Sequence, residues 1–236
     1  MPANLIFPYQ DRVLEALKDQ LAPFYLAGGT ALAKFYFQHR ESYDLDFFSR
    51  DYSVAKIREL VRTIEEETGK TMKLLSENRK EGFAKLMIYA LSLGREESLK
   101  IDFVEDLLPL AAPLNQVNGI GVLSLDDIYI RKIHAASGAL PVLTKTGQKN
   151  FLGGRTEAKD FIDLYQLSST YKPLALFASE HCDDLQKEAL IRWYSTYSRP
   201  EIKVGLAELR TKNPVEFVTL ERHFKKEIDK LIGEIV

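Results

Sequence analysis

Two short motifs in the first fifth of the sequence have the residue types of a phosphate- and metal-binding site. Gly28 and Gly29 precede Thr30 at the expected start of a helix, where free backbone N–H groups can hold a phosphate. Asp44 and Asp46 lie in the run Tyr-Asp-Leu-Asp-Phe-Phe, which is typical of a β-strand. Side chains alternate along a strand, so both carboxylates share one face. Metal-assisted nucleotidyl transfer requires a phosphate-binding segment and paired carboxylates that bind the metal, and the sequence has both in this order.

The carboxylate pair has a second interpretation. Aspartate is unfavoured in strands, and a solvent-facing edge strand would also account for Asp44 and Asp46. A Mg²⁺ site, with Mn²⁺ as the alternative ion, accounts for them better, because like-charged carboxylates repel unless a cation lies between them. Such a site needs another acid from a neighbouring strand, and we predict that Asp102 is this third metal ligand. The alternative is that Asp102 pairs with a surface lysine, either Lys100 or Lys85.

The elements that position these residues follow from hydrophobic periodicity and turn signals. Strands are expected at 24–27, 43–48, 71–75, 83–93 and 99–104. Helices are expected at 9–20, 31–36 and 53–67, and, because the β-signals nearly vanish after residue 123, from 124 and from 156 onward. We therefore predict an α+β fold. A mixed sheet with flanking helices occupies residues 1–121, and a helical domain over 122–236 completes the active-site cleft.

Composition limits the class of protein. Hydrophobic residues make up 45% and charged residues 28% of the 236 positions, as in globular proteins. No stretch approaches the roughly 20 apolar residues of a membrane span, and the first residues do not resemble a signal peptide. One cysteine, Cys182, excludes an internal disulfide, and the net charge of −2 argues against a dedicated duplex-binding protein. We expect a cytoplasmic protein without a membrane partner.

Several motifs occur in the order found in one known family. Residues 26–32 and 39–48 resemble the first motif of the AbiEii-type nucleotidyltransferases, which belong to the polymerase-β-like nucleotidyltransferase superfamily. Residues 131–135 and 155–165 resemble two later motifs, so the resemblance covers roughly residues 24–167. Many members of this family are the toxin of a type IV toxin–antitoxin pair, and some transfer nucleotides from an NTP to the 3′ end of tRNA. The resemblance implies that fold, that activity and a cognate antitoxin as partner.

The resemblance also implies roles for individual residues in the first half of the chain. Asp44 and Asp46 would hold the metal. The residues that would face the triphosphate are Gly28, Gly29 and Thr30.

Further roles concern the second half and the residues just before the carboxylate pair. Lys132 corresponds to the family's nucleotide-binding lysine, and Asp160 to the acid that begins its K-D-x-x-D-L motif. Asp160 and Asp163 are three positions apart and share a helix face, and one of these acids would fix Lys132 or the acceptor end; the alternative is a surface ion pair of little energetic value. Arg40 and Ser42 are assigned to the nucleotide site. For Arg40 two roles stay open, contact with phosphate or support of Asp44.

The expected reaction is attack of an acceptor hydroxyl on the α-phosphate of an NTP, with release of pyrophosphate. Asp102 would complete the metal site and help to deprotonate the acceptor, for which the tRNA 3′ end is the first choice. Two other functions fit the same residues: transfer to a small molecule or a protein side chain, and a non-catalytic nucleotide-binding module that docks a partner. The stretch between Lys132 and Lys159 is long for the family, and it contains the glycine-rich segment 138–154. We expect it to be a flexible excursion that acts as a lid, as an acceptor-binding loop or not at all.

Overall fold

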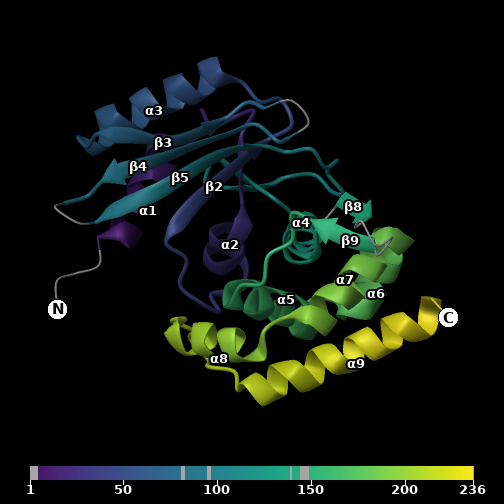
Figure 1. Cartoon of the computed structure of the whole chain (residues 1–236). Helices are drawn as coiled ribbons and strands as arrows, with labels where there is room; N and C mark the ends of the chain where they lie inside the picture. Colours follow the sequence, from purple (N-terminus) through teal and green to yellow (C-terminus); the bar gives the residue numbers. More distant parts are fainter. Residues whose placement is uncertain (1–4, 81–82, 95–96, 139, 144–148, 236) are drawn as a thin grey trace. The chain divides into compact units, whose positions relative to one another are not determined.

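The computed structural model describes residues 5–80, 83–94, 97–138, 140–143 and 149–235 (Figure 1). The chain divides into two compact units. Unit 1 comprises Met1–Tyr36 and Ser42–Asp127, and unit 2 comprises Phe37–Glu41 and Ile128–Val236. The short segment 37–41, which precedes the paired carboxylates in the sequence, therefore belongs to unit 2. The expected division at residue 121 stays a prediction.

Unit 1 is built on a seven-stranded mixed sheet with the strand order β3-β4-β5-β2-β1-β7-β6. Its strands are β1 (Tyr25–Ala27), β2 (Asp44–Ser49), β3 (Met72–Asn78), β4 (Leu86–Ser92), β5 (Ser98–Glu105), β6 (Asn115–Val117) and β7 (Ile120–Val122). The pairs β2–β5 and β1–β7 are parallel, whereas the other neighbours are antiparallel. The predicted turn at Asn118 and Gly119 joins β6 to β7, and both residues have the positive φ that a two-residue hairpin turn requires.

Helices of unit 1 pack against this sheet and against one another. They are α1 (Ile6–Ala16), the short α2 (Gly28–Ala31) with its π-helical continuation η1 (Leu32–Phe37), and α3 (Val54–Thr68). Figure 1 shows α3 running along the strands β3 and β4. Its buried side chains recur at helical spacing, at Ile57, Leu60 and Ile64. Ser53 caps α3 as its sequence predicts, since Oγ accepts a hydrogen bond from the Lys56 backbone N–H at 3.3 Å.

Unit 2 is mainly helical. Its helices are α4 (Leu125–Ser137), whose first turn belongs to unit 1, and α5 (Ala158–Thr170), α6 (Leu174–His181), α7 (Asp184–Thr196), α8 (Arg199–Glu208) and α9 (Phe217–Ile235). Aromatic rings form its core: Phe161 lies 4.4 Å from Trp193 and 5.6 Å from Phe224 between ring centroids. The predicted class, a mixed sheet with flanking helices followed by a helical part, is confirmed.

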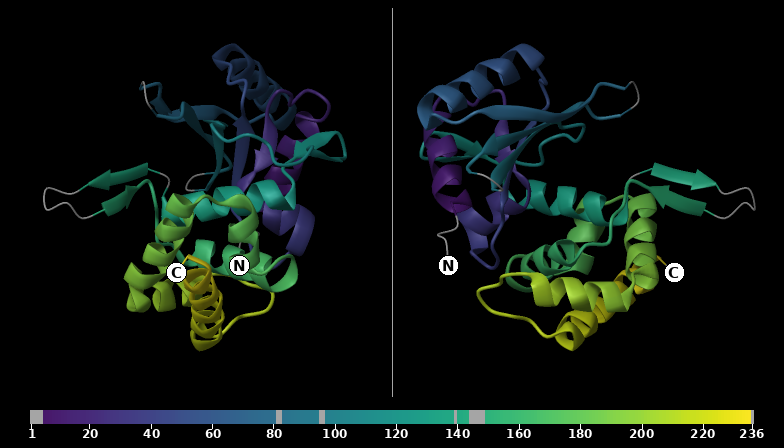
Figure 2. Two further views of the ribbon diagram at one scale, coloured as in Figure 1. Left: turned by 90° about the vertical axis from the view of Figure 1, so that its right-hand side faces the viewer. Right: turned by 60° about the vertical axis from the view of Figure 1, so that its left-hand side comes forward.

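Two expectations about the elements are wrong. The first helix was expected over 9–20, but it ends at Ala16, and Asp19 has a left-handed backbone with φ of 58°. The half of the chain after residue 121 was expected to be all-helical, with 138–154 as a flexible excursion between two helices, but this segment contains the antiparallel hairpin of β8 (Leu140–Leu143) and β9 (Lys149–Leu152). Figure 2 shows this hairpin extending away from the helices of its unit. Its glycines and Pro141 suggested a loop, whereas pairing between two short segments decided the structure. Residues 139 and 144–148 lie outside the described part.

In the described part of the chain, no helix has the length and apolar character needed to cross a membrane.

Candidate active site

Three carboxylates share one face of the unit 1 sheet. Along β2, Asp44 and Asp46 alternate with the fully buried Leu45 and Phe47. The neighbouring strand β5 is parallel to β2, and the register pairs Asp46 directly with Asp102. Paired residues of adjacent strands project to the same side of a sheet. The structure therefore brings the three predicted metal ligands to one face.

A lysine lies among these acids. Lys100 is the register partner of Asp44, and its Nζ lies 2.5 Å from Oδ2 of Asp102. Burial by itself would lower the pKa of Lys100, but the hydrogen bond to Asp102 and the charges of Asp102, Asp46 and Asp44 outweigh burial and raise the pKa. The pairing of Asp102 with a lysine, which the sequence left open, is thus present and involves Lys100.

Gly28 lies directly against one of the carboxylates. Its φ of +68° falls in the left-handed region, and an added Cβ would lie 2.1 Å from Oδ2 of Asp46. Pairing of β1 with β2 creates this approach, because Ala27 is the register partner of Asp46. A glycine is therefore required at the point where α2 begins, beside the carboxylate.

Hydroxyl groups hold the start of β2 in place. Thr30 Oγ1 donates a hydrogen bond to the Asp44 carbonyl at 2.6 Å and lies 2.8 Å from Ser42 Oγ. Ser42 Oγ donates to Oδ1 of Asp44 at 3.2 Å. From α1, the buried Gln10 donates to the carbonyls of Ser42 and Asp44 at 2.9 and 3.1 Å. These bonds fix the backbone that carries the first carboxylate. That Thr30 and Ser42 face a nucleotide stays a prediction.

A second cluster lies in unit 2 and is centred on Asp163, which is fully buried. Arg40 binds it with both arms of its guanidinium, Nε to Oδ1 at 2.7 Å and Nη2 to Oδ2 at 2.8 Å. Nε2 of His39 lies 2.7 Å from Oδ1, and the Lys132 ammonium lies 2.6 Å from Oδ2. One carboxylate thus joins α5, α4 and the segment 37–41.

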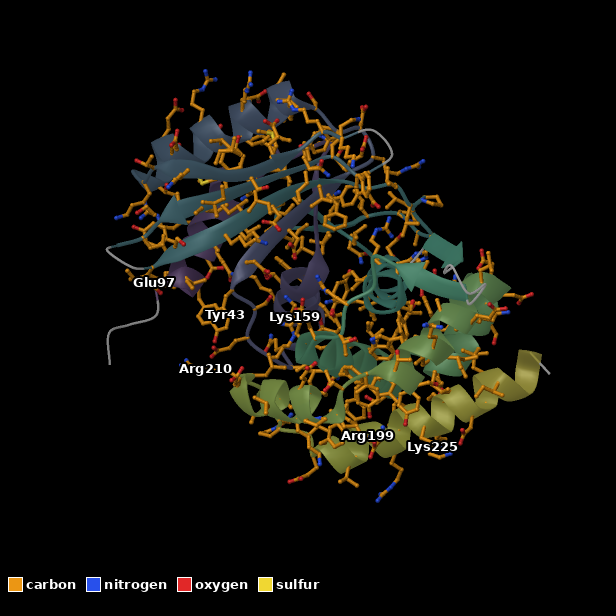
Figure 3. The ribbon with its side chains drawn as sticks, in the orientation of Figure 1. Tyr43, Glu97, Lys159, Arg199, Arg210 and Lys225 are labelled. Atoms are coloured by element: carbon orange, nitrogen blue, oxygen red, sulfur yellow. The ribbon has the colours of Figure 1, made fainter. Side chains whose placement is uncertain are left out.

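Asp160, one helical turn before Asp163 on α5, is also fully buried. Its Oδ1 lies 3.3 Å from the Lys132 ammonium, and its Oδ2 accepts from Arg155 Nε at 2.7 Å. One acid of this helix was expected to fix Lys132 or the acceptor end; Asp160 and Asp163 both contact Lys132, and these contacts are buried and not the surface ion pair that was the alternative. Lys159, labelled in Figure 3, differs: it pairs with Glu157 at 2.9 Å on the surface.

Backbone bonds hold the segment 37–41 within unit 2. The Glu41 N–H donates to the Arg210 carbonyl at 2.8 Å, and the Lys212 N–H donates to the His39 carbonyl at 3.0 Å. These bonds flank an antiparallel bridge between Arg40 and the loop that follows α8. The position of the Arg40 side chain is thus fixed at both its backbone and its guanidinium.

The charged forms of Asp160, Asp163 and Lys132 stabilise one another. Burial would raise the pKa of Asp163, but the charges of Lys132 and Arg40 and the hydrogen bonds to the carboxylate hold it well below its usual range. Burial would likewise raise the pKa of Asp160, which Arg155 and Lys132 lower overall. Burial would lower the pKa of Lys132, and the two aspartates raise it overall. The opposite charges therefore keep each other ionised in a dry environment.

The carboxylate face suits a divalent cation. Carboxylate oxygens are the hard ligands that Mg²⁺ prefers, and three of them project from adjacent positions with a glycine backbone alongside. Among the residues that the structure describes, no three acidic, histidine or cysteine side chains already converge as ligands around one point. Instead, the ammonium of Lys100 offsets the carboxylate charges. The donor set fits a magnesium site whose side chains must still adjust.

Some residues of these two clusters gave little sign in the sequence. Gln10 lies in an ordinary amphipathic helix, and only the fold shows that it binds the backbone before β2. His39 had no recognisable partner. Asp163 shares a helix face with Asp160, as the sequence indicates, but only the fold shows that it contacts both His39 and Arg40. Arg40 was expected near a phosphate or Asp44, and both roles stay predictions beside its observed contact with Asp163.

Comparison with known proteins gives a match over nearly the whole chain. The model of the family described as nucleotidyl transferase AbiEii toxin, type IV TA system, matches residues 12–234. No curated protein sequence matches. JHP933 from Helicobacter pylori is similar in fold, with 17% identity and a TM-score of 0.56 over 98% of this chain and 93% of that one. A proposed nucleotidyltransferase from H. pylori shows 16% identity and a TM-score of 0.59 over 98% of both chains. MenT4, a nucleotidyltransferase toxin from Mycobacterium tuberculosis, shows 18% identity and a TM-score of 0.48 over 97% of this chain and 83% of that one.

Proposed function

The chain belongs to the AbiEii family of nucleotidyltransferase toxins of type IV toxin–antitoxin systems, and from this premise we propose that it transfers a nucleoside monophosphate from an NTP to the 3′ end of tRNA. The observation that supports a catalytic site in this chain is the register of β2 and β5. It brings Asp44, Asp46 and Asp102 to one face, and Gly28 allows the backbone to approach that face.

Residues of unit 1 would bind the metal and begin the reaction. Asp44, Asp46 and Asp102 would hold Mg²⁺ or Mn²⁺, which when bound would neutralise charge on the triphosphate and on the pyrophosphate that leaves. The oxygen of the acceptor hydroxyl forms a bond to the α-phosphorus as the bond to pyrophosphate breaks. The hydroxyl proton passes to the Asp102 carboxylate. The backbone N–H groups of Gly28 and Gly29 would bind phosphate oxygens.

Residues of unit 2 would bind the triphosphate. A lysine ammonium has three N–H donors, and Asp160 and Asp163 account for two contacts of Lys132, so we propose that the third serves a phosphate oxygen. Asp160 would hold the ammonium in place. Arg40 would act beside Lys132 as a second positive charge that Asp163 positions.

The acceptor and the partner rest on the family. Members that modify the 3′ end of tRNA make tRNA the first acceptor to test, and a toxin of a type IV system implies a cognate antitoxin. Because charged NTPs and tRNA are substrates found inside cells, we propose that the protein acts in the cytoplasm. Transfer to a small molecule or a protein side chain would use the same metal and triphosphate contacts.

The test is incubation of the purified protein with Mg²⁺, each α-³²P-labelled NTP in turn and total tRNA. The Asp46→Asn variant serves as the inactive comparison, and circular dichroism checks that it is folded. Label on tRNA that is lost in Asp46→Asn supports the proposal and names the nucleotide. Label on the protein itself would replace the tRNA acceptor by a side chain. Full activity of Asp46→Asn would contradict the metal assignment.

A further inference from the structure

Lys100 places a positive charge inside the carboxylate face of unit 1, defined by Asp44, Asp46 and Asp102. It precedes Asp102 by two positions on β5, so both side chains project to the same side. The register pairs Lys100 with Asp44 and Asp102 with Asp46. Two cross-strand pairs of ionisable side chains therefore lie next to each other, and Lys100 is the one cation among the four.

The ammonium already contacts an atom that a metal would need. Lys100 Nζ donates to Oδ2 of Asp102 at 2.5 Å, and the charges of all three carboxylates act on it. Like charges on adjacent strand positions destabilise a sheet, and the ammonium offsets that repulsion when no metal is bound. A divalent ion on the same carboxylate oxygen would repel the ammonium, so the two cations compete for one position.

We propose that Lys100 is a built-in counter-ion that competes with the divalent cation for the carboxylate face. The inference rests on the metal site of the proposed function. Lys100 is a positioning residue: it holds Asp102 and lowers the repulsion among the acids until the metal binds. Binding of the metal must then release the ammonium from Asp102. The affinity for metal is therefore weaker than the three carboxylates alone would provide.

The sheet offers a matched lysine for comparison. Lys85 contacts Oε1 of Glu105 at 2.7 Å, and its side chain is 46% exposed, the same fraction as that of Lys100. Glu105 lies three positions after Asp102 on β5, so its side chain projects from the opposite face of the sheet. Loss of the Lys85 charge should therefore leave the metal site unaffected.

The experiment is calorimetric titration of Mn²⁺ into the full-length protein, the variants Lys100→Met and Lys100→Arg, and the control Lys85→Met. Lys100→Met should bind Mn²⁺ about fivefold more tightly, because a partly exposed ion pair contributes about 1 kcal/mol. Lys100→Arg keeps the charge and should stay within about twofold of the wild type, as should Lys85→Met. Thermal melts check folding, and Lys100→Gln replaces the methionine variant if that variant is unfolded.

The results separate this inference from the proposed function. Mn²⁺ binding that is lost in Asp46→Asn but unchanged or weaker in Lys100→Met would overturn the role of Lys100 and leave the metal site standing. An equal gain in Mn²⁺ affinity in Lys85→Met would also overturn the role of Lys100, because the loss of any positive charge would then have the same effect. Absence of Mn²⁺ binding by both the wild type and Lys100→Met would overturn the metal site together with this inference.

Discussion

At the scale of single residues, Gly28 leaves no room for a side chain beside the carboxylate of Asp46. Gly28→Ala would add a methyl group 2.1 Å from Oδ2 of Asp46 at a φ of +68°. We expect a loss of activity of about 100-fold or more, because the carboxylate must move by an amount that misplaces a reacting group. The assay of NTP turnover measures it.

Gly69 provides the control for this change. It has a similar φ of +63°, but an added Cβ would meet nothing within 4 Å. Gly69→Ala should lower the free energy of unfolding by about 1 kcal/mol through backbone strain and leave turnover unchanged. Equal loss of turnover in both variants would show that backbone strain, and not contact with Asp46, is responsible.

Replacement of Asp163 should lower the stability of the protein strongly. Asp163→Asn would leave the buried cations of Arg40 and Lys132 without their shared carboxylate, and removal of one partner from a buried ion pair costs about 3–5 kcal/mol. Urea denaturation measures this change. Asp229→Asn, which breaks the exposed pair with Lys225, should change the free energy of unfolding by less than about 1 kcal/mol. A similar small effect at Asp163 would contradict the central role of this carboxylate.

At the scale of elements, the start of β2 is held by side chains of α1 and α2. Thr30→Val keeps the shape of the side chain but removes the hydroxyl that donates to the Asp44 carbonyl at 2.6 Å. The Asp44 carbonyl keeps the hydrogen bond from Gln10, so we expect a loss of about 0.5–1.5 kcal/mol in stability, together with a fall in kcat as Asp44 loses one of its supports. Ser195→Ala removes an exposed hydroxyl that bonds to its own helix and should affect neither. Unchanged kcat in Thr30→Val would show that the hydroxyl does not position Asp44.

The buried acids of α5 predict how the helical unit responds to acid. The folded-state pKa values of Asp160 and Asp163 are both lowered, so their contribution to stability is fully present above the unfolded-state pKa, near 4. It is lost as the pH falls through the folded-state values. The free energy of unfolding should therefore decline below about pH 4, with about 1.4 kcal/mol per pH unit from each acid. Denaturation of Asp163→Asn across this range should show the smaller decline, and an identical slope would contradict the assignment.

At the scale of the whole molecule, unit 2 depends on a segment that lies far from it in the sequence. A fragment of residues 122–236 lacks His39 and Arg40, which contact the fully buried Asp163. We expect this fragment to unfold without cooperativity or at a much lower temperature than the full chain, because a buried carboxylate loses two partners. Calorimetry measures this. A fragment as stable as the full chain would show that the segment 37–41 is not part of the folded unit.

Local periodicity in the sequence was sufficient for most of the elements and for contacts within one element. Alternation along a strand put Asp44 and Asp46 on one face, and helical spacing put Asp160 and Asp163 on another. Turn residues marked the ends of strands. The strand pattern repeats every two residues and the helix pattern every three to four, so both can be read from a short stretch of sequence. The hairpin β8–β9 was missed because its short, glycine-flanked strands have little periodicity of their own.

Only the tertiary structure decided which elements are neighbours. The register of β2 and β5 sets Asp102 beside Asp46 and Lys100 beside Asp44, across more than fifty residues of chain. The pairing of Arg40 with Asp163 spans 123 positions. Strand register and packing between distant segments depend on how the whole chain buries its apolar surface, and no local pattern records that outcome. The sequence by itself therefore determined the residue types and their faces within each element, while the fold determined which charges meet.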